Sequence, residues 1–367
     1  MRRFFDTKLI DHFDWALFSC VAAILFLSLL NLYSATFDLP AARFFRSQLV
    51  WISIGTAVAT FVLFFDYRLL ERLSLPIYCL SVLLVALVLF TGRSVLGAQR
   101  WLQIGPLSLQ PSELAKIGIV IGLARYFHTW RGSRALSLAG LFWPGLMTAV
   151  PVLLILKQPD LGTAIIVFSI SAAMILFVGV RNRVLALAVV AALIAIPFAW
   201  RYALRPYQKS RVQMFLNPER DALGQGYQII QSKIAIGAGE FSGKGYLKGT
   251  QSKLQFLPKQ YTDFVFSNFA EEFGFLGSIL LLGLYASVSL LGLNVAFMAK
   301  ERFGMMLGVG LTALVTSQAV INLGMEMGLL PVVGVTLPLF SYGGTSLITT
   351  LFAVGLLLNI SMRRYMF

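Results

Sequence analysis

One acidic residue stands where a polar, basic segment meets an apolar one, and its neighbours suit proton transfer. Asp263 lies in LPKQYTDFVFSNFAEEFGF, which begins at Leu257, with Tyr261 and Phe264 close to it. Burial against aromatic rings and nearby lysines can adjust the pKa of a carboxylate, as a general base requires. The simpler interpretation is that Asp263, like Thr262, caps the helix that follows. These residues indicate a general base and leave the helix cap as the alternative.

A pair of opposite charges occurs within an otherwise apolar stretch. Glu113 and Lys116, in QPSELAK, are three residues apart and therefore share one face of a helix, where they can pair. An ionisable side chain inside a membrane span costs about 2.5–3.5 kcal/mol on insertion scales, which makes both residues functional candidates. An internal salt bridge that holds the helix to its neighbours is the competing interpretation. We favour a dual role, in which the pair also shapes a polar cavity that opens outward.

Asp160, in KQPDLGTA, precedes another predicted helix. A helix N-cap has at least as much support here as a direct chemical role, since Asp is a preferred capping residue. The further candidates for binding substrate or supporting a cavity are Arg100, Lys244, Lys248, Ser341 and Thr345. The carboxylates could bind a divalent cation through their hard oxygens or serve only as bases, so the sequence leaves metal use open.

Membrane-spanning helices must position these residues. The chain has 367 residues, of which 58% are hydrophobic and 13% charged, whereas a soluble domain has about 25% charged residues. Its apolar runs approach the roughly 20 residues that cross a bilayer. We predict an all-α polytopic integral membrane protein, with one membrane domain over residues 1–367. About ten spans can be drawn, at 15–34, 47–65, 73–91, 111–127, 138–156, 161–180, 184–200, 270–297, 304–324 and 346–361.

The net charge of +14 is explained mainly by topology. Lysine and arginine favour the cytoplasmic side of membrane proteins, and with a cytoplasmic N-terminus that side receives Arg2, Arg3, Lys8, Arg68, Arg72, Arg125, Arg131, Arg134, Arg181, Arg183, Lys300, Arg302, Arg363 and Arg364. The short loops opposite receive Arg43, Arg46, Arg93, Arg100 and Lys157. We therefore place both termini in the cytoplasm and expect no nucleic-acid partner.

Three segments on the predicted outer side interrupt the apolar pattern. Residues 201–262 form a large basic loop between the seventh and eighth spans, and residues 92–116 form a second polar loop. Residues 328–346 are apolar but broken by proline and glycine, which predicts a re-entrant or interfacial loop covered by protein or lining a cavity. The glycine-rich stretch 235–249 lacks P-loop spacing. Flexible turns are favoured there, and a phosphate-binding nest of backbone N–H groups is the weaker alternative.

Five motifs occur in one order between residues 97 and 346, namely GAQRWL, QPSELAK, QPDLGTA, LPKQYTDFVFSNFAEEFG and LPVVGVTLPLFSYGGTS. Together they resemble the SEDS family of shape, elongation, division and sporulation membrane proteins. PVVGVTLP and the opening IDHFDW are similar to the rod-shape branch of that family. SNFAEEFG and KQYTDF depart from the common family pattern but roughly keep its size and polarity.

The resemblance implies a peptidoglycan glycosyltransferase in the bacterial cytoplasmic (inner) membrane that serves cell elongation and rod-shape maintenance. Its substrate would be lipid II, an undecaprenyl-pyrophosphate-linked disaccharide pentapeptide. Asp263 matches the essential aspartate of the family, while Glu113, Lys116 and Asp160 match positions regarded as functionally important. The implied partners are a class B penicillin-binding protein, which is a transpeptidase, and other membrane proteins of the elongation complex.

A lipid II flippase and a non-catalytic scaffold of the elongation machinery are the alternatives. A flippase should show polar residues along a path into the cytoplasmic half, whereas the polar residues of this chain gather toward the outer side. A scaffold leaves the cost of the intramembrane charges unexplained. The distribution favours an enzyme that works at the outer face.

Overall fold

The structure is a computed structural model. It describes residues 12–36, 41–95, 98–104, 107–130, 135–203, 206–221, 225–253, 256 and 260–364. Five of the cations predicted on the cytoplasmic side lie outside these residues, namely Arg2, Arg3, Lys8, Arg131 and Arg134.

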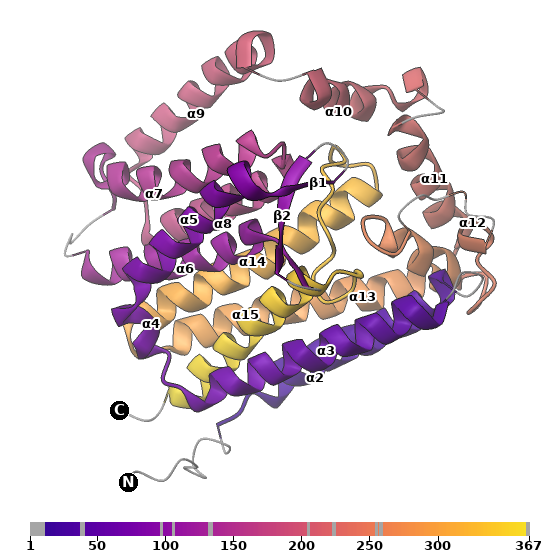
Figure 1. The fold of residues 1–367 in the computed structure, drawn as a ribbon, viewed down its shortest axis with the longest axis horizontal. Helices are drawn as coiled ribbons and strands as arrows, with labels where there is room; N and C mark the ends of the chain where they lie inside the picture. Colours follow the sequence, from indigo (N-terminus) through magenta and orange to yellow (C-terminus); the bar gives the residue numbers. More distant parts are fainter. Residues whose placement is uncertain are drawn as a thin grey trace.

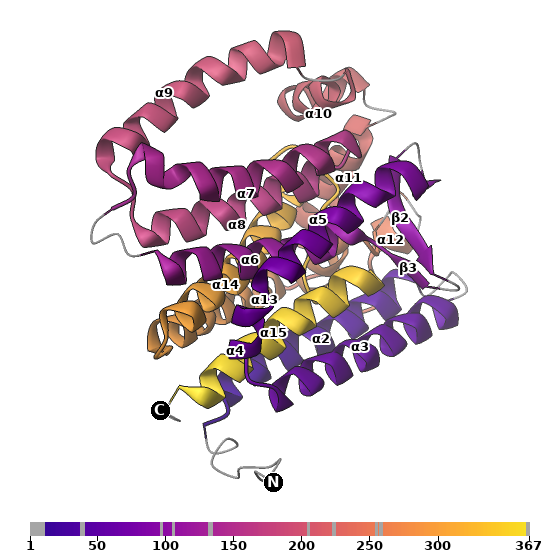
Figure 2. The same cartoon turned by 60° about the vertical axis from the view of Figure 1, so that its left-hand side comes forward.

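Long helices pack side by side into one bundle (Figures 1 and 2). Within the described part of the chain, nine helices are long and apolar enough to span a membrane. They are α2 (Trp15–Ala35), α3 (Ala41–Phe64), α5 (Ser74–Thr91), α7 (Leu138–Lys157), α8 (Leu161–Val178), α9 (Asn182–Phe198), α13 (Val265–Met298), α14 (Arg302–Glu326) and α15 (Gly344–Arg363). The helix α9 stands apart from the bundle in both views, and none of its side chains is buried.

The helix α6 (Pro111–Thr129) is a tenth long helix in the described part of the chain and lies within the bundle. It carries Glu113, Lys116 and Arg125, which make it less apolar than the other nine. It packs against α5, α8 and α14, and most of its side chains are buried. Because protein rather than lipid surrounds α6, its charges can find partners inside the bundle. The prediction of an all-α membrane protein with about ten spanning helices is confirmed.

The two ends of the bundle differ in structure. The start of α2 and the end of α15 lie at one end, beside the short helix α4 (Arg68–Arg72) (Figures 1 and 2). The opposite end carries an antiparallel sheet in the order β1 (Arg93–Val95), β2 (Ala98–Ile104) and β3 (Leu107–Leu109). The segment expected to be a polar loop is therefore partly a sheet, in which Leu102 pairs with Leu109 and Ile104 with Leu107.

The predicted outer loop 201–262 is largely helical. It contains a π-helical turn (Ala199–Ala203), α10 (Pro206–Leu216), a 3-10 turn (Pro218–Asp221), α11 (Gln225–Ala238) and α12 (Thr250–Lys253). The helix α11 packs along α13. The next span begins at Val265, five residues earlier than predicted, and its helix is interrupted at Gly274.

Glycines join this outer segment to the interruption in α13. Gly243 and Gly274 both have positive φ, at 80° and 63°. A Cβ atom on Gly243 would clash with the carbonyl oxygen of Glu272, and one on Gly274 with the amide nitrogen of Gly243. The N–H groups of Lys244 and Gly245 donate to the carbonyls of Glu271 and Glu272, both at 3.0 Å. The turns predicted for this stretch are present at residues 239–242 and 246–247. The phosphate-nest interpretation is wrong, because the backbone is packed against α13 and these N–H groups are already paired.

Residues 331–343 form no helix, and several of their side chains are buried. Side chains of the bundle bind their carbonyl groups: Ser28 donates to Phe340 O at 2.7 Å, and Tyr285 to Pro338 O at 2.6 Å. Such protein partners are what irregular backbone needs at membrane depth. The segment lines the candidate site described next.

Candidate active site

A cavity of about 580 Å³ opens between the sheet, the outer ends of several helices and the irregular segment. Aromatic, aliphatic and polar side chains line it together, a common composition for ligand sites. Its lining is Trp51, Arg100, Trp101, Ser108, Gln110, Glu113, Asp160, Thr163, Ile166, Arg211, Tyr261, Thr262, Asp263, Gln318, Val333, Gly334, Val335, Thr336, Tyr342, Gly343, Gly344, Thr345 and Ser346. The cavity thus brings together Arg100, Glu113, Asp160, Asp263 and Thr345, all of which the sequence singled out.

Asp263 lies on the cavity wall, in the turn before α13. A methyl group on Gly334 would lie 3.8 Å from its Oδ2 atom, so the carboxylate faces the irregular segment. The N-cap residue of α13 is Phe264, whose side chain makes no capping hydrogen bond. Asp263 is therefore not the N-cap of this helix, and the alternative drawn from the sequence is wrong in that form.

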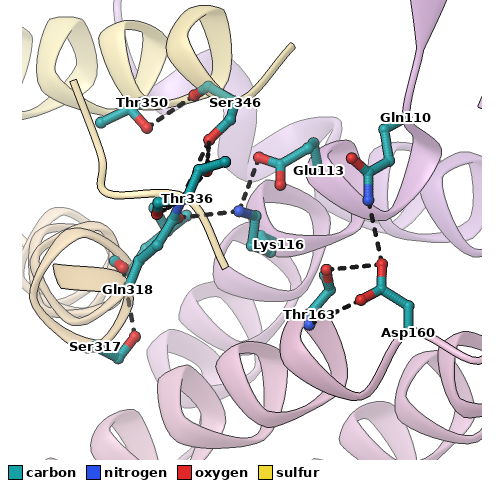
Figure 3. A network of polar contacts seen from close by, with 11 residues as sticks. Gln110, Glu113, Lys116, Asp160, Thr163, Ser317, Gln318, Thr336, Ser346 and Thr350 are labelled. Atoms are coloured by element: carbon teal, nitrogen blue, oxygen red, sulfur yellow. Dashed lines mark hydrogen bonds and ion pairs between the residues drawn. The ribbon is translucent and has the colours of Figure 1, made fainter. Parts of the chain in front are cut away.

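Asp160 combines the two roles that the sequence left open. Its Oδ1 accepts from the N–H of Thr163 at 3.2 Å, which makes it the N-cap of α8. Its Oδ2 accepts from Thr163 Oγ1 at 3.0 Å and from Gln110 Nε2 at 3.2 Å (Figure 3). Arg100 Nη1 is 3.8 Å from Oδ1, and the same guanidinium binds the carbonyls of Gln158 and Pro159. Asp160 therefore fixes the start of α8 while it lines the cavity.

Arg211, on α10, is a second guanidinium on the cavity wall. Burial and the neighbouring Arg100 lower the pKa of Arg211 from its ordinary value, and Tyr207, Asp160 and Asp263 oppose this effect. Two arginines and two aspartates thus lie within electrostatic reach of one another. The sequence did not single out Arg211, because it is one of many cations in a basic segment and no local motif distinguishes it.

Glu113 lines the cavity and forms the predicted pair with Lys116. Lys116 Nζ is 2.7 Å from Glu113 Oε2 and donates to Gln318 Oε1 at 3.0 Å (Figure 3). The amide of Gln318 in turn donates to Thr336 O and to Ser346 Oγ, at 3.1 and 3.2 Å. One network therefore links α6, α14, the irregular segment and α15. Gln318 was missed in the sequence, although a polar residue within an apolar span is a usable signal.

The other predicted residues have different surroundings. Lys244 binds the buried carboxylate of Glu271 at 2.7 Å and does not line the cavity. Lys248 is exposed and also lies away from it. Ser341 is buried and accepts from the N–H of Leu337 at 2.8 Å. Thr345 does line the cavity and donates to Ser108 O at 3.2 Å.

Among the residues that the structure describes, no three His, Cys, Asp or Glu side chains form a metal-binding group. Asp160 and Asp263 nevertheless both line the cavity with carboxylate oxygens, the kind of ligand that hard divalent cations prefer. A cation bound there would need further oxygen ligands from the substrate of the protein.

Comparison with known proteins shows which proteins this chain is similar to. Peptidoglycan glycosyltransferase MrdB of Escherichia coli strain K12 is 38% identical over 356 residues, which cover 97% of this chain and 95% of the relative. A chain of a peptidoglycan synthase complex that coordinates polymerization and crosslinking is 38% identical and superposes with a TM-score of 0.84 over 96% of this chain and 98% of its own. The crystal structure of Thermus thermophilus rod shape determining protein RodA gives 33% identity and a TM-score of 0.72 over the same shares.

The model of the FTSW_RODA_SPOVE family, described as "Cell cycle protein", matches residues 11–366. The resemblance drawn from the five motifs is confirmed over nearly the whole chain, and so is its rod-shape branch. The chain belongs to the FTSW_RODA_SPOVE family.

Proposed function

We infer that the chain is a peptidoglycan glycosyltransferase of the bacterial cytoplasmic membrane that polymerises lipid II during cell elongation and rod-shape maintenance. Relatives with this activity in their names match it over almost their full length. The observation that carries the chemistry is the cavity itself, which is lined by Asp263, Arg100 and Arg211.

In the reaction we propose, the acceptor 4-hydroxyl attacks the anomeric carbon of the lipid-linked MurNAc. The new C–O bond forms as the bond to pyrophosphate breaks, and Asp263 takes the hydroxyl proton. Arg100 and Arg211 stabilise the negative charge that develops on the oxygens of the leaving pyrophosphate. A pyrophosphate needs cations rather than a strong acid to depart, so the second carboxylic acid of a hydrolytic glycosidase is unnecessary.

The interior below the cavity argues against a flippase. On the cytoplasmic side of Lys116, α6 buries Val120, Leu123 and Phe127, and α14 buries Leu311 and Leu314. These apolar side chains are fully or almost fully enclosed in one core cluster. Among the described residues, a headgroup would meet mainly apolar side chains there, whereas the outer cavity offers many polar ones. The geometry therefore supports an enzyme that works from the outer face.

The partner that we assign is a class B penicillin-binding protein, with further membrane proteins of the elongation complex. The similar chain of known structure belongs to a peptidoglycan synthase complex that coordinates polymerization with crosslinking. A polymerase that releases glycan strands at the outer face needs such a transpeptidase beside it.

A divalent cation is a further component that we propose to test. Asp160 and Asp263 would supply hard oxygens from the protein, and the pyrophosphate would supply the rest. Adding Mg²⁺ back to chelated enzyme measures this contribution directly.

The activity is tested with purified protein, labelled lipid II and the partner transpeptidase present or absent. Glycan polymer should appear on gels and should increase with the partner. Failure of the folded complex to form any polymer would contradict the proposal. Transfer of lipid II across sealed vesicles without polymer would instead favour the flippase.

A further inference from the structure

The start of α13 is held by a carboxylate from another helix. Glu326, the last residue of α14, accepts from the N–H of Phe266 at 3.2 Å with Oε1. Its Oε2 accepts from the N–H and the hydroxyl of Ser267, at 2.7 and 2.8 Å. These are second- and third-position N–H groups, which a capping side chain would normally satisfy. Glu326 thus caps, from outside, a helix whose own N-cap residue offers no side-chain bond.

A second residue of α14 holds the turn immediately before that helix. Asn322 Nδ2 donates to the carbonyl of Asp263 at 3.1 Å and to that of Val335 at 2.8 Å. Asn322 and Glu326 are four residues apart and therefore share one face of α14. Asn322 is therefore hydrogen-bonded to the backbone of Asp263 itself. Glu326 is hydrogen-bonded to the backbone of Phe266 and Ser267, three and four residues further along the chain.

The contacts of Asn322 and Glu326 are buried, and Ser232 of α11 packs against them. Ser232 Oγ lies 2.6 Å from Ser267 Oγ and 2.6 Å from the carbonyl of Glu326. Ser232, Ser267, Asn322 and Glu326 all have an exposed fraction of 0%. The carboxyl oxygens satisfy N–H groups that would otherwise be unpaired in a buried place. The arrangement leaves the turn that carries Asp263 little freedom to shift.

We propose that Asn322 and Glu326 are positioning residues for the glycosyl transfer, which fix the carboxylate of Asp263 against the substrate by clamping the turn and first helical residues around it. The proposal rests on the proposed function in one respect, namely that Asp263 is the base. Proton transfer depends steeply on geometry, and a displacement of about 1 Å can cost roughly 100-fold in rate. The clamp should therefore act on turnover rather than on substrate binding.

The test compares Glu326→Gln, Asn322→Ala and Asp263→Asn in the purified complex with lipid II. Glu326→Gln replaces one acceptor oxygen by a donor group that faces an N–H, and Asn322→Ala releases the carbonyl of Asp263. Each should lower kcat roughly 10- to 100-fold, while KM for lipid II changes less than about twofold. Rates are expressed per folded enzyme, measured by monodisperse elution and partner binding.

Asn359→Ala is the matched control. Asn359 is also fully buried on a long helix, α15, and donates Nδ2 to two backbone carbonyls, those of Val62 and Phe65, both at 2.6 Å. It does not line the cavity. It should lose stability as Asn322→Ala does yet keep its kcat, which separates positioning from general support of the fold.

The outcomes distinguish the two proposals. Wild-type kcat in Glu326→Gln and Asn322→Ala, together with an inactive Asp263→Asn, overturns the clamp and leaves the base in place. Activity in Asp263→Asn removes the base assignment itself. If the first two variants do not fold, Ser267→Ala decides, because it deletes only one of the three hydrogen bonds to Glu326. It should lower kcat roughly 2- to 10-fold, and an unchanged kcat would overturn the clamp.

Discussion

Lys116 and Glu113 form an ion pair one helical turn apart, with Nζ and Oε2 separated by 2.7 Å and the lysine side chain only 1% exposed. The ammonium group also binds Gln318 of α14 at 3.0 Å, so it is shared between two helices beneath the cavity. A buried charge so placed depends on its partners, and this dependence can be measured.

Lys116→Met should impair folding or polymerisation, because it leaves Glu113 buried without its counter-ion at a cost of about 3–5 kcal/mol. Combining it with Glu113→Gln should be less harmful than the sum of the single changes. A double-mutant cycle on thermal stability and on polymerisation rate measures the coupling. Some loss should persist in the double variant, since Gln318 Oε1 also loses its donor. Strict additivity would show that the two side chains act separately.

Arg211→Gln should lower kcat/KM for lipid II roughly 10- to 100-fold, as expected from the ~1.5–3 kcal/mol of a hydrogen bond to a charged group. Arg211→Lys should recover only part of this, because an ammonium cannot bind a phosphate oxygen pair as a guanidinium does. Lys209→Gln is the control, since Lys209 lies on the same helix but faces a separate hollow beside Trp200 and Arg201. Equal losses for Lys209→Gln and Arg211→Gln would indicate a nonspecific effect of charge.

Gly243→Ala should destabilise the protein, because the residue has a φ of 80° and its Cβ would meet the backbone of Glu272. A left-handed backbone alone costs a non-glycine residue about 1–3 kcal/mol. Gly237→Ala is the contrast: Gly237 lies in α11 with no atom within 4 Å of a Cβ placed on it. It should be neutral or stabilising by up to about 1 kcal/mol. Melting temperatures of the two variants in detergent provide the comparison. Equal values would contradict the close packing described between Gly243 and the interruption of α13 at Gly274.

The helices and the intramembrane pair were predictable because each has a local signal. Apolar runs of about 20 residues locate spans, and a spacing of three residues puts Glu113 and Lys116 on one face. The N-cap role of Asp160 was predictable too, because Asp is a preferred capping residue and a predicted helix follows it.

Contacts between distant segments carry no such signal. At the early start of α13, the N–H of Ser267 donates to Glu326, which lies 59 residues away in the chain. Lys244 resembles a free cation in the sequence, yet it neutralises Glu271, a carboxylate that also accepts from the N–H of Thr250 at 2.9 Å. Pairings of this kind form only once the chain has folded, so local reasoning made Lys244 a candidate for binding substrate or supporting the cavity.

A cysteine placed at Lys248 should react with a membrane-impermeant reagent added to intact cells. Lys248 is exposed and belongs to the segment that we predict to be extracytoplasmic from the distribution of lysine and arginine. A cysteine at Arg364, the residue that directly follows α15, should react only after permeabilisation. The reverse pattern would invert the topology and remove the cavity from the outer face.

Asp263→Asn should reduce polymerisation by about 10²- to 10⁴-fold or to an undetectable level, which is the usual contribution of a general base. The amide keeps the size of the side chain but cannot take the proton of the acceptor hydroxyl. Folding and partner binding should survive, because the N-terminus of α13 is capped by Glu326 rather than by Asp263. Polymer on gels and co-purification with the transpeptidase measure the two properties separately.

Asp263→Glu sharpens the same test, since it keeps the charge and moves it. One added methylene shifts the carboxylate by more than about 1 Å, which a proton transfer tolerates poorly. We therefore expect Asp263→Glu to recover little activity, whereas a residue that only supplied negative charge to the cavity would be replaced well by glutamate. Near wild-type turnover by folded, partner-bound Asp263→Asn would move the search for the base to Glu113 and Asp160, the other carboxylates on the cavity wall. Of these two, Asp160 also caps α8 and accepts from Gln110, and Glu113 is paired with Lys116. A substitution at either would disturb α8 or the ion pair as well as any proton transfer, so a loss of polymerisation there would count only in protein shown to be folded and bound to its partner.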